Sequence, residues 1–357
     1  MKESERQNLL FRTRNPDNLE GSQEVFDASH TAVEAFFVRN HFDVPAIDVG
    51  AWTLGVEGSV DRPQVFRFDD LQHYEQREVV ATMECAGNGR ARLGERAKGV
   101  PWRGNAIGTA RWSGVALQAV LNDVGIRGDV EEVVFVGADS GVVETYDGAE
   151  LSMPYARGLP REKALLDEVL IATHMNGKPL TPAHGYPARL IVPGWYGMAS
   201  VKWLVRIIAL DHRFDGYFQT EDYAVWEQVR GLAERRSLGP MAIKSHIGYP
   251  LDGQHFQEGE DVTIRGFAWG GEGKIEAVEV SFDEGMTFHA ATLSDSQHPY
   301  AWRAWSYDWT VPDTAGEVTM YSRARTDRGE SQPRDHDWTR GAYAVNAMLP
   351  VTVFVGS

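Results

Sequence analysis

A period-two alternation of apolar and polar residues in the last third of the chain is the strongest constraint on its fold. Four short segments carry the pattern: residues 262–265, 278–282, 318–321 and 351–355. Alternation of this kind buries one face of a strand and leaves the other face in water. Turn sequences such as Asp283-Glu284-Gly285 separate the segments. Short strands with regular turns indicate a β-sandwich, which we expect over residues 241–357.

The chain before residue 240 mixes helical and strand-like segments. Residues 113–125 have apolar side chains at helical spacing between Ser113, a suitable N-cap, and Gly125, a suitable stop. Residues 31–34 fit a capping box for a short helix. Buried strands are expected at residues 133–136, 190–192 and 205–210. The sequence therefore predicts a mixed domain and an α+β fold class.

The expected organisation has three parts. Residues 1–30 are polar and are expected to form an N-terminal arm, and residues 31–240 form the mixed domain. Residues 241–357 form the sandwich, with the boundary near the sequence Leu238-Gly239-Pro240. A chain of 357 residues with 43% hydrophobic residues can supply two hydrophobic cores.

Charge and targeting signals exclude several functions. The formal net charge of −16 repels nucleic acid and anionic membranes, so neither is an expected partner. No apolar run approaches the roughly 20 residues that cross a bilayer, and the N-terminal sequence lacks the pattern of a leader. We expect a cytoplasmic protein as the sequence is written, or a periplasmic one if a leader has been removed.

Cys85 is the only cysteine of the chain. A single cysteine excludes an intrachain disulfide and a CxxCH motif, so no c-type haem is expected. The thiol follows a strand-like run and precedes the sequence Ala86-Gly87-Asn88-Gly89, whose small residues let backbone amides approach a ligand. Taken alone, Cys85 could be a buried apolar residue, a metal ligand, or a nucleophile paired with His184 or His41. Spacing does not decide between these interpretations.

Several motifs occur in one order along the chain. They are FVRNH at residues 37–41, CAGN at 85–88, KGVPW at 98–102, ARWSG at 110–114, HGYPAR at 184–189, VPG at 192–194 and SVKWL at 200–204. Together they resemble the sulfite oxidase family of molybdenum enzymes, and the resemblance covers nearly the whole chain beyond residue 30. The sequence GFAW at residues 266–269 resembles part of the family's immunoglobulin-like dimerisation domain. The resemblance thus implies a molybdopterin-binding domain followed by an immunoglobulin-like sandwich.

The resemblance also implies a cofactor site. Cys85 corresponds to the family's thiolate ligand of molybdenum, whose other sulfur ligands come from molybdopterin without an attached nucleotide. The residues implied to bind the cofactor are Phe37, Asn40, His41, Asp139, His184, Arg189, Gly197, Ser200 and Lys202. Met198-Ala199 replaces a more usual Ala-Arg pair, so an arginine expected at the cofactor phosphate is absent. No haem is expected in this chain.

Five residues match the family's catalytic positions. They are Arg39, Lys98, Trp102, Tyr223 and Arg340. Nitrate reductases of the family carry asparagine in place of the tyrosine and methionine in place of the last arginine, so the resemblance implies sulfite oxidation to sulfate. Arginines and a lysine suit a tetrahedral oxyanion. The loop after Asn88 departs from the family, because it reads Gly-Arg-Ala-Arg where animal sulfite oxidases carry two consecutive arginines.

The implied partners are sulfite, an external electron acceptor (cytochrome c or dioxygen) and a second copy of the chain in a homodimer. Four alternatives remain: an assimilatory-type nitrate reductase, a sulfane dehydrogenase subunit, a non-catalytic relative and a cysteine hydrolase. Tyr223 and Arg340 argue against the first, and a haem-bearing partner would reveal the second. Metal analysis separates the non-catalytic relative from a molybdenum enzyme. Loss of all activity on removal of molybdenum, with the thiol still free, would exclude the hydrolase.

Overall fold

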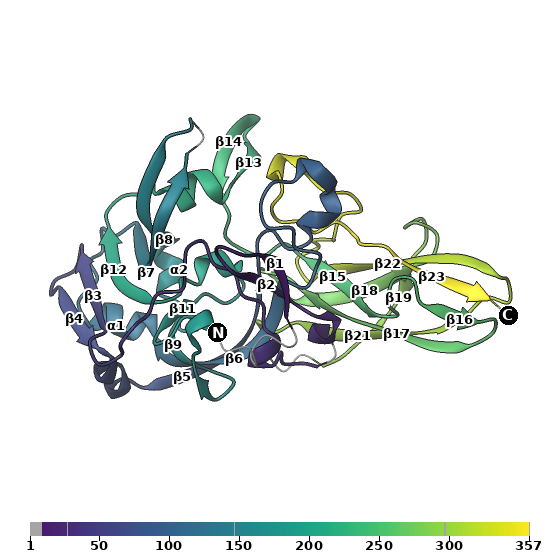
Figure 1. Cartoon of the computed structure of the whole chain (residues 1–357), viewed down its shortest axis with the longest axis horizontal. Helices are drawn as coiled ribbons and strands as arrows, with labels where there is room; N and C mark the ends of the chain where they lie inside the picture. Colours follow the sequence, from purple (N-terminus) through teal and green to yellow (C-terminus); the bar gives the residue numbers. More distant parts are fainter. Residues whose placement is uncertain (1–8, 27, 146, 296–297, 357) are drawn as a thin grey trace.

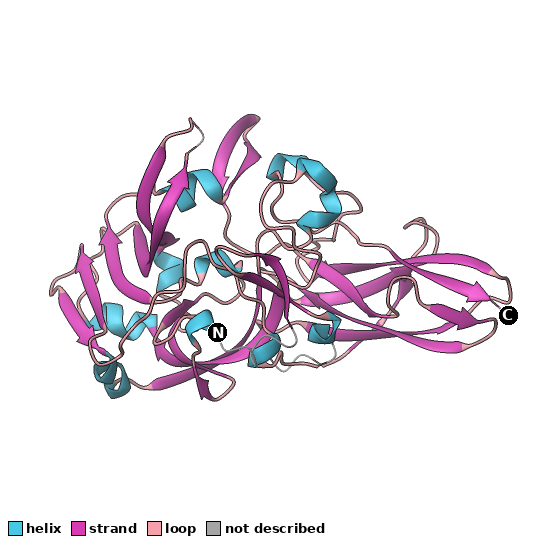
Figure 2. Ribbon diagram, viewed as in Figure 1, coloured by secondary structure: helices cyan, strands magenta, loops and turns pink. Residues whose placement is uncertain are grey.

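The computed structural model describes residues 9–26, 28–145, 147–295 and 298–356 and contains two bodies of secondary structure. Figure 1 shows a broad N-terminal body and an elongated C-terminal body that ends at the C-terminus. Figure 2 shows that strands dominate both and that helices are short. Separate hydrophobic clusters form their cores, with Phe135 and Leu204 in one and Ile264 and Val353 in the other.

Two five-stranded sheets build the N-terminal body. The first has the order β4 (Gln64–Arg67), β3 (Thr53–Gly58), β12 (Leu204–Leu210), β7 (Glu132–Glu144) and β8 (Glu150–Pro160). The second has the order β10 (Lys178–Pro179), β9 (Leu170–Met175), β6 (Ile107–Ala116) and β5 (Gln76–Glu84), with β11 (Arg189–Ile191) also paired to β9. Strands β3 and β12 are parallel, and the other pairs are antiparallel. Cys85 directly follows the end of β5.

The C-terminal body is the predicted β-sandwich. One sheet has the order β15 (Lys244–Tyr249), β17 (Asp261–Trp269), β21 (Arg303–Thr310) and β20 (Thr292–Leu293). The other has the order β16 (His255–Gln257), β23 (Val351–Gly356), β22 (Gly316–Thr326), β18 (Ile275–Ser281) and β19 (His289–Ala290). The alternating apolar residues of β17 and β18 are buried between the sheets, as the pattern predicts.

Strands predicted in the N-terminal body are confirmed within β7, β11 and β12. The helix expected from Ser113 is wrong at its start, since α1 spans Leu117–Asp123. Ser113 lies in β6, where its hydroxyl donates to Glu78 over 3.3 Å and its backbone pairs with β5 and β9. The apolar face of the helix is confirmed, because Leu117, Val120, Leu121 and Val124 are fully buried.

The predicted helix cap at residues 31–34 is also wrong. Thr31 bonds to β6 instead: its N–H donates to the Thr109 carbonyl over 2.7 Å, and its hydroxyl accepts from the Thr109 N–H over 3.1 Å. Only a 3₁₀ turn, η3 (Val33–Ala35), follows. Sheet contacts therefore override the local capping signal.

The described part of the N-terminal arm forms a hairpin, β1 (Leu9–Thr13) with β2 (Asn18–Gly21). Glu20 at its end is buried and accepts bonds from the backbone N–H groups of Arg103, Gly104 and Asn105. The hairpin thereby ties the arm to the segment after the cysteine loop.

Helix α1 has seven residues and α2 (Arg161–Ala164) has four. No described helix has the length and apolar character to span a membrane.

Candidate active site

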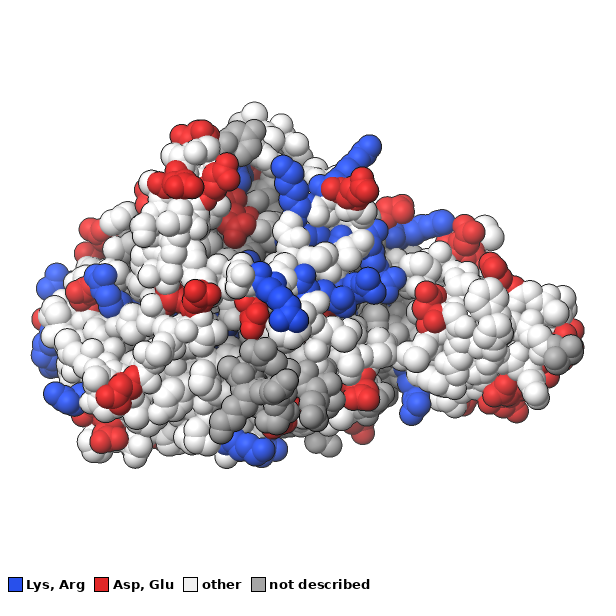
Figure 3. Space-filling view, in the orientation of Figure 1, with Lys and Arg blue, Asp and Glu red and all other residues white. Residues whose placement is uncertain are grey.

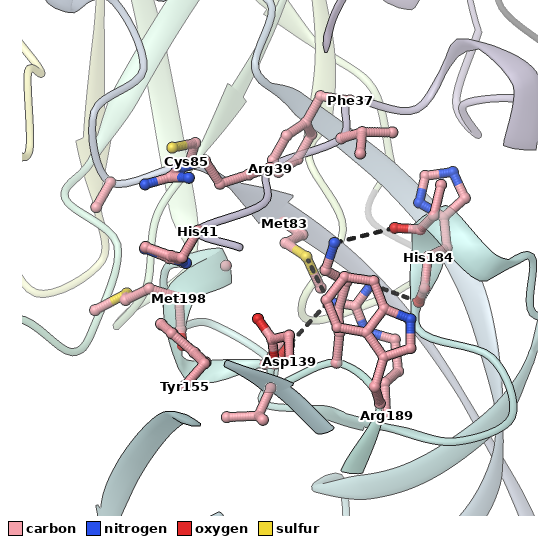
Figure 4. Close-up of a pocket in the computed structure, with 18 of the residues that line it drawn as sticks. Phe37, Arg39, His41, Met83, Cys85, Asp139, Tyr155, His184, Arg189 and Met198 are labelled. Carbon is pink, nitrogen blue, oxygen red and sulfur yellow. Dashed lines mark hydrogen bonds between the residues drawn. The ribbon is translucent and has the colours of Figure 1, made fainter. Parts of the chain in front are cut away.

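A cavity lies beside Cys85 and collects most of the predicted site residues. Figure 4 shows Cys85, Arg39 and His41 grouped at one end, with His184 and Arg189 at the other. The predicted residues that line it are Phe37, Arg39, His41, Cys85, Asp139, His184, Arg189, Gly197, Ser200, Lys202 and Tyr223. They come from segments spread over almost two hundred positions, so the tertiary fold assembles this site.

Cys85 is 6% exposed and is fixed by its backbone. Its N–H donates to the Ala106 carbonyl over 2.9 Å, and its carbonyl accepts from the Asn88 N–H over 2.8 Å. Burial raises the pKa of the Cys85 thiol, whereas the guanidinium of Arg39, the N–H of Gly87 and the guanidinium of Arg90 act in the opposite direction. Fixed cations around a buried thiol favour the thiolate that a metal ion binds.

Asn88 explains the asparagine of the CAGN motif. Its side-chain amide donates to Glu84 and to the Gly104 carbonyl, each over 3.0 Å, and its side-chain oxygen accepts from the Ala106 N–H over 3.0 Å. Every hydrogen-bonding group of this buried side chain thus closes the loop around the cysteine. Such a satisfied network holds the thiol in one position.

Arg90 is a site residue that our sequence reasoning missed. It begins η5 (Arg90–Arg96), is buried, and lies with its guanidinium carbon 4.8 Å from the centre of the Tyr343 ring. Its Nε donates to the Ala342 carbonyl over 3.1 Å. A side chain on Gly87 or Gly99 would overlap the guanidinium, so both glycines make room for it. The signal was its place two residues after Asn88, where the family carries its second consecutive arginine.

Arg39 belongs to the FVRNH motif at residues 37–41 and lines the cavity together with Cys85. Its guanidinium donates to the Asn18 side chain over 3.4 Å and also to the Asn40 carbonyl. Burial by itself lowers the pKa of Arg39, but the neighbouring Tyr223 and Cys85 outweigh this effect and the pKa is raised. Arg39 therefore stays charged, and its guanidinium gives the cavity a cation suited to an oxyanion. Arg90 is a second cation near the thiol, but it is not among the residues that line the cavity.

His41 and Tyr223 complete this end of the cavity. The Tyr223 hydroxyl lies 2.7 Å from His41 Nε2, and the imidazole stacks on Tyr155 with ring centres 4.4 Å apart. Burial, reinforced by Arg39, Lys202 and Arg157, holds the pKa of His41 well below its ordinary value. Burial likewise raises the pKa of Tyr223. At neutral pH the site thus has a neutral imidazole beside a neutral phenol.

The opposite end of the cavity is built from His184, Arg189 and Lys202. Arg189 donates to the carbonyls of His184 over 3.0 Å and Ser200 over 2.9 Å, and burial lowers its pKa to about 9. Lys202 donates to the Asn40 side chain and, over 3.1 Å, to the Ala183 carbonyl. Burial, with Arg189 and Lys202 nearby, lowers the pKa of His184 to about 3. Fixed cations of this kind suit a phosphate monoester.

Two buried polar atoms show whether the implied cofactor fits. Asp139 Oδ1 and Arg189 Nε have no hydrogen-bond partner among the described residues, and both residues line the cavity. Burial raises the pKa of Asp139 to about 6, while the cation of Lys202 opposes this rise. A ligand with amine donors for Asp139 and acidic oxygens for Arg189 would satisfy these atoms. A molybdopterin has both groups, so the residues present fit it.

Four predicted residues lie outside this cavity. Asn40 is buried behind Lys202, and Trp102 is fully buried with its ring centre 6.4 Å from that of Phe37. Lys98 is exposed on the loop after η5. Arg340 lies in η9 (Trp338–Arg340), where its side chain is 36% exposed and its Nε is 3.6 Å from Asp337. The structure therefore does not bring Lys98 or Arg340 to the thiol.

Charge is unevenly distributed around this centre. Figure 3 shows acidic side chains scattered over the visible face, whereas basic side chains gather in its middle, where Figure 1 draws β1 and β2. The chain carries a formal net charge of −16. The basic side chains in the middle of this face are thus a local exception on an acidic molecule.

Comparisons with known proteins agree with this geometry. A family model described as "Oxidoreductase molybdopterin binding domain" matches residues 41–218, and one described as "Mo-co oxidoreductase dimerisation domain" matches residues 235–354. The chain is 36% identical to mitochondrial sulfite oxidase of Rattus norvegicus over 343 residues, which cover 91% of this chain and 61% of the rat protein. It is 33% identical to sulfite oxidase of Gallus gallus over 344 residues, which cover 91% of this chain and 73% of the chicken protein.

Among solved structures, the sulfane dehydrogenase SoxCD from Paracoccus pantotrophus superposes with a TM-score of 0.81 and 27% identity. The superposition covers 96% of this chain and 85% of that chain. The shared architecture, the two matched domains and the extent of the identity with the chicken enzyme lead to one conclusion. The chain belongs to the sulfite oxidase family of molybdopterin-binding, molybdenum-dependent oxidoreductases.

Proposed function

We propose that this enzyme oxidises sulfite to sulfate and passes the electrons to an external acceptor. The observation that carries the proposal is a pair of cations that act on the thiol of Cys85. Arg39 is partly buried and lines the cavity with Tyr223, and Arg90 is buried in the loop after Cys85. A small divalent oxyanion suits this position, because hydrogen bonds to charged groups contribute about 1.5–3 kcal/mol each.

The chain's own residues hold the reactants. The Cys85 sulfur is the proposed metal ligand, while Arg189, Lys202 and the backbone around Ser200 are proposed to hold the phosphate of molybdopterin. When bound, the molybdenum centre supplies oxygen-atom transfer and accepts two electrons. Arg39 and Arg90 orient the sulfite anion and stabilise its charge without reorganisation. Tyr223, kept neutral by its burial, donates one hydrogen bond to an oxygen of the reacting anion.

The test uses molybdenum-loaded wild-type protein. It should reduce ferricyanide or cytochrome c only when sulfite is present, with two electrons delivered per sulfate formed. The matched Cys85→Ser variant should lose molybdenum and turnover together while it keeps its folded structure. Nitrate-dependent oxidation of a reduced viologen, without sulfite oxidation, would show that the protein is a nitrate reductase instead. Hydrolytic activity that depends on Cys85 and survives removal of molybdenum would point to a cysteine hydrolase.

A second candidate reaction is the oxidation of sulfane sulfur. The likeness to the sulfane dehydrogenase SoxCD, with its TM-score of 0.81, supports this candidate. Assays with thiosulfate or a polysulfide in place of sulfite separate the two reactions. Turnover of sulfane sulfur that needs a copurified haem protein, with none on sulfite, would replace the first proposal.

We also propose that two copies of the chain associate through the sandwich, as the matched dimerisation domain at residues 235–354 suggests. Light scattering on the loaded enzyme should give twice the chain mass of 39.8 kDa. A closed, two-fold arrangement is the usual form of such association. A mass of one chain at all micromolar concentrations would contradict this.

A further inference from the structure

A buried arginine lies beside the active-site cavity without lining it. Arg157 on β8 is 1% exposed, and its guanidinium carbon is 5.8 Å from the centre of the Tyr223 ring. Tyr155, two residues earlier on the same face of the strand, lines the cavity, whereas Arg157 is not among the lining residues. Burial of a charged group costs free energy, so a guanidinium at this place indicates a role that an apolar side chain cannot fill.

The hydrogen bonds of Arg157 to described residues all end on oxygens without a formal charge. The guanidinium donates to the Phe218 carbonyl, to the Ser237 hydroxyl over 2.8 Å and to the Leu238 carbonyl over 2.9 Å. Burial lowers the pKa of Arg157, but an arginine stays protonated at neutral pH. These contacts therefore fix the positions of chain segments and do not neutralise a carboxylate.

Arg157 holds the chain before Tyr223. One of its hydrogen bonds goes to the first carbonyl of η8 (Phe218–Asp222), a π-helical turn that ends directly before Tyr223. The next residue of β8 contributes as well, because the Gly158 N–H donates to the Gln219 side chain over 3.3 Å. Turns of this kind are rare and often occur at functional sites. Two successive residues of β8 thus bind the turn that leads into Tyr223.

The same guanidinium holds the chain after Tyr223. Strands β13 (Ala224–Val229) and β14 (Leu232–Ser237) form a hairpin that starts there and projects from the N-terminal body (Figure 1). Every residue of β14 is exposed, so this strand adds no buried side chain that would hold the base of the hairpin. At that base, the Leu238 N–H donates to the Tyr223 carbonyl over 2.8 Å, and Arg157 binds the Leu238 carbonyl. Arg157 therefore joins both ends of the segment that presents Tyr223 to the cavity.

We propose that Arg157 is a positioning residue of the active site, which holds the chain on both sides of Tyr223 and so keeps the phenol directed into the cavity. The inference rests on the proposed function, in which Tyr223 donates a hydrogen bond to the reacting anion. Arg157 contacts no reactant and acts through the position of the phenol. Its planar guanidinium has five N–H donors in a rigid fork and can bind three oxygens at once, whereas a lysine ammonium has one flexible nitrogen.

Replacement of Arg157 should weaken sulfite binding in the loaded enzyme. In Arg157→Met the released phenol should lose its bond to the anion, so the KM for sulfite should rise by about tenfold. A loss of folded protein alone would lower the apparent kcat and leave the KM unchanged. Arg157→Lys keeps the charge without the fork and should show most of the same rise. A wild-type KM in Arg157→Lys would mean that only the charge matters, which would overturn the proposal.

The matched control is Arg303→Met in β21. Arg303 also donates to backbone carbonyls, those of Ile275 over 2.6 Å and Ser294 over 3.2 Å, but it lies in the sandwich. Its variant should have the wild-type KM even if it unfolds more easily. Ser237→Ala removes one acceptor of Arg157 without a change of charge and should raise the KM by about two- to fivefold. This variant keeps the proposal testable if Arg157→Met does not fold.

A double variant shows whether Arg157 acts through Tyr223. In a Tyr223→Phe background no hydroxyl remains to be positioned, so the addition of Arg157→Met should change the KM by less than about twofold. Equal rises of the KM in the wild-type and Tyr223→Phe backgrounds would mean that Arg157 acts independently of the phenol, and the proposal would be wrong.

A second readout needs neither cofactor nor substrate. In metal-free protein with carbon-13-labelled tyrosine, the Tyr223 ring signal is the one that Tyr223→Phe removes. Arg157→Met and Ser237→Ala should shift or broaden it, and Arg303→Met should leave it unchanged. If wild-type enzyme oxidises no sulfite, the proposed function fails whatever this signal does. If wild-type enzyme oxidises sulfite while Arg157→Met and Ser237→Ala change neither the KM nor this signal, the positioning role alone fails.

Discussion

Two guanidinium groups, one before and one after Cys85 in the sequence, act electrostatically on its thiol. Arg39 and Arg90 both oppose the rise that burial causes in the pKa of this thiol. Arg90 is held by the Ala342 carbonyl and by the ring of Tyr343. Cations already in position need no rearrangement when an anion binds, which makes them effective in a site of low polarity.

Replacement of Arg90 should weaken substrate binding. Arg90→Met removes a charged hydrogen-bond donor worth about 1.5–3 kcal/mol, so the KM for sulfite should rise by about 10- to 100-fold with a smaller change in kcat. Steady-state kinetics of loaded enzyme measure both constants. The matched control is Arg92→Met, because Arg92 lies on the same helix but is exposed. An unchanged KM for Arg90→Met would show that its guanidinium does not contact the anion.

His184 should make the stability of the metal-free protein depend on pH. Its folded pKa of about 3 lies below its ordinary value of 6.5, so the unfolded chain binds a proton that the folded chain does not. Stability from this group is complete above pH 6.5 and is lost as the pH falls towards 3. His184→Gln should therefore flatten the slope of unfolding free energy against pH by about 1.4 kcal/mol per pH unit. Urea unfolding at several pH values measures the slope.

The control for that slope is His73→Gln, since His73 is exposed in η4 (Phe68–His73). This variant should keep the wild-type dependence on pH. A slope for His184→Gln equal to that of wild type would mean that the imidazole is protonated in the folded protein or is not buried there.

Individual site residues could be predicted from the sequence only where they belong to a recognisable motif. Cys85, His184 and Lys202 stand in recognisable motifs, and the fold brings them to one cavity. Arg90 was overlooked because Gly89 stands before it, where the family has the first of two consecutive arginines. The glycines of the same loop leave space for its side chain, since a side chain on Gly87 would overlap the guanidinium. The roles predicted for Lys98 and Arg340 stay predictions, since their positions depend on loops whose conformation no local pattern specifies.

At the scale of elements, the period of the hydrophobic residues predicted strands and helices better than the helix-capping residues did. The alternating segments became β17, β18, β22 and β23, because alternation fixes which face of a strand is buried. The helix predicted from Ser113 starts later, since residues before Leu117 pair with two neighbouring strands. A cap residue can satisfy a helix end or a strand partner, and only tertiary contacts choose between them. The domain boundaries stay predictions.

The loop after β5 should be intolerant of side chains at its glycines. In Gly87→Ala the new Cβ would lie 2.5 Å from a nitrogen of the Arg90 guanidinium, so the arginine must move. The KM for sulfite should then rise by about tenfold, the equivalent of 1.4 kcal/mol, without loss of the thiol. Steady-state kinetics and thiol titration measure the two effects.

Gly128→Ala is the control for the loop, because no described atom lies within 4 Å of the position that its new methyl group would take and no left-handed backbone is required there. It should have wild-type kinetics. If Gly87→Ala also has them, the guanidinium of Arg90 has room to move without leaving the substrate position.

At the scale of the whole molecule, a buried ion pair joins the two bodies next to the thiol. Glu84, the last residue of β5, accepts from Lys244 Nζ on β15 over 3.0 Å and from Trp269 Nε1 on β17 over 2.9 Å. The side chains of Glu84 and Lys244 are 3% and 2% exposed. Asn88 donates to the same carboxylate, so this charged group links the sandwich to the cysteine loop.

Removal of one member of the Glu84–Lys244 pair should lower the free energy of unfolding far more than removal of both. Lys244→Met leaves the Glu84 carboxylate buried and unpaired, which should lower the unfolding free energy by about 3–5 kcal/mol. The double variant Glu84→Gln with Lys244→Met should recover much of this loss. Urea unfolding gives the energies, and molybdenum content shows whether the loop still holds the metal. Equal destabilisation in the single and double variants would mean that the pair does not interact.

This ion pair limits how such a chain can change in evolution. A gene fusion that exchanged the sandwich for another module would leave a carboxylate stranded in apolar surroundings one residue from the proposed metal ligand. Recombination between relatives should therefore give a stable protein only when Glu84 and Lys244 come from the same parent. The two halves of the gene are thus expected to share a common history.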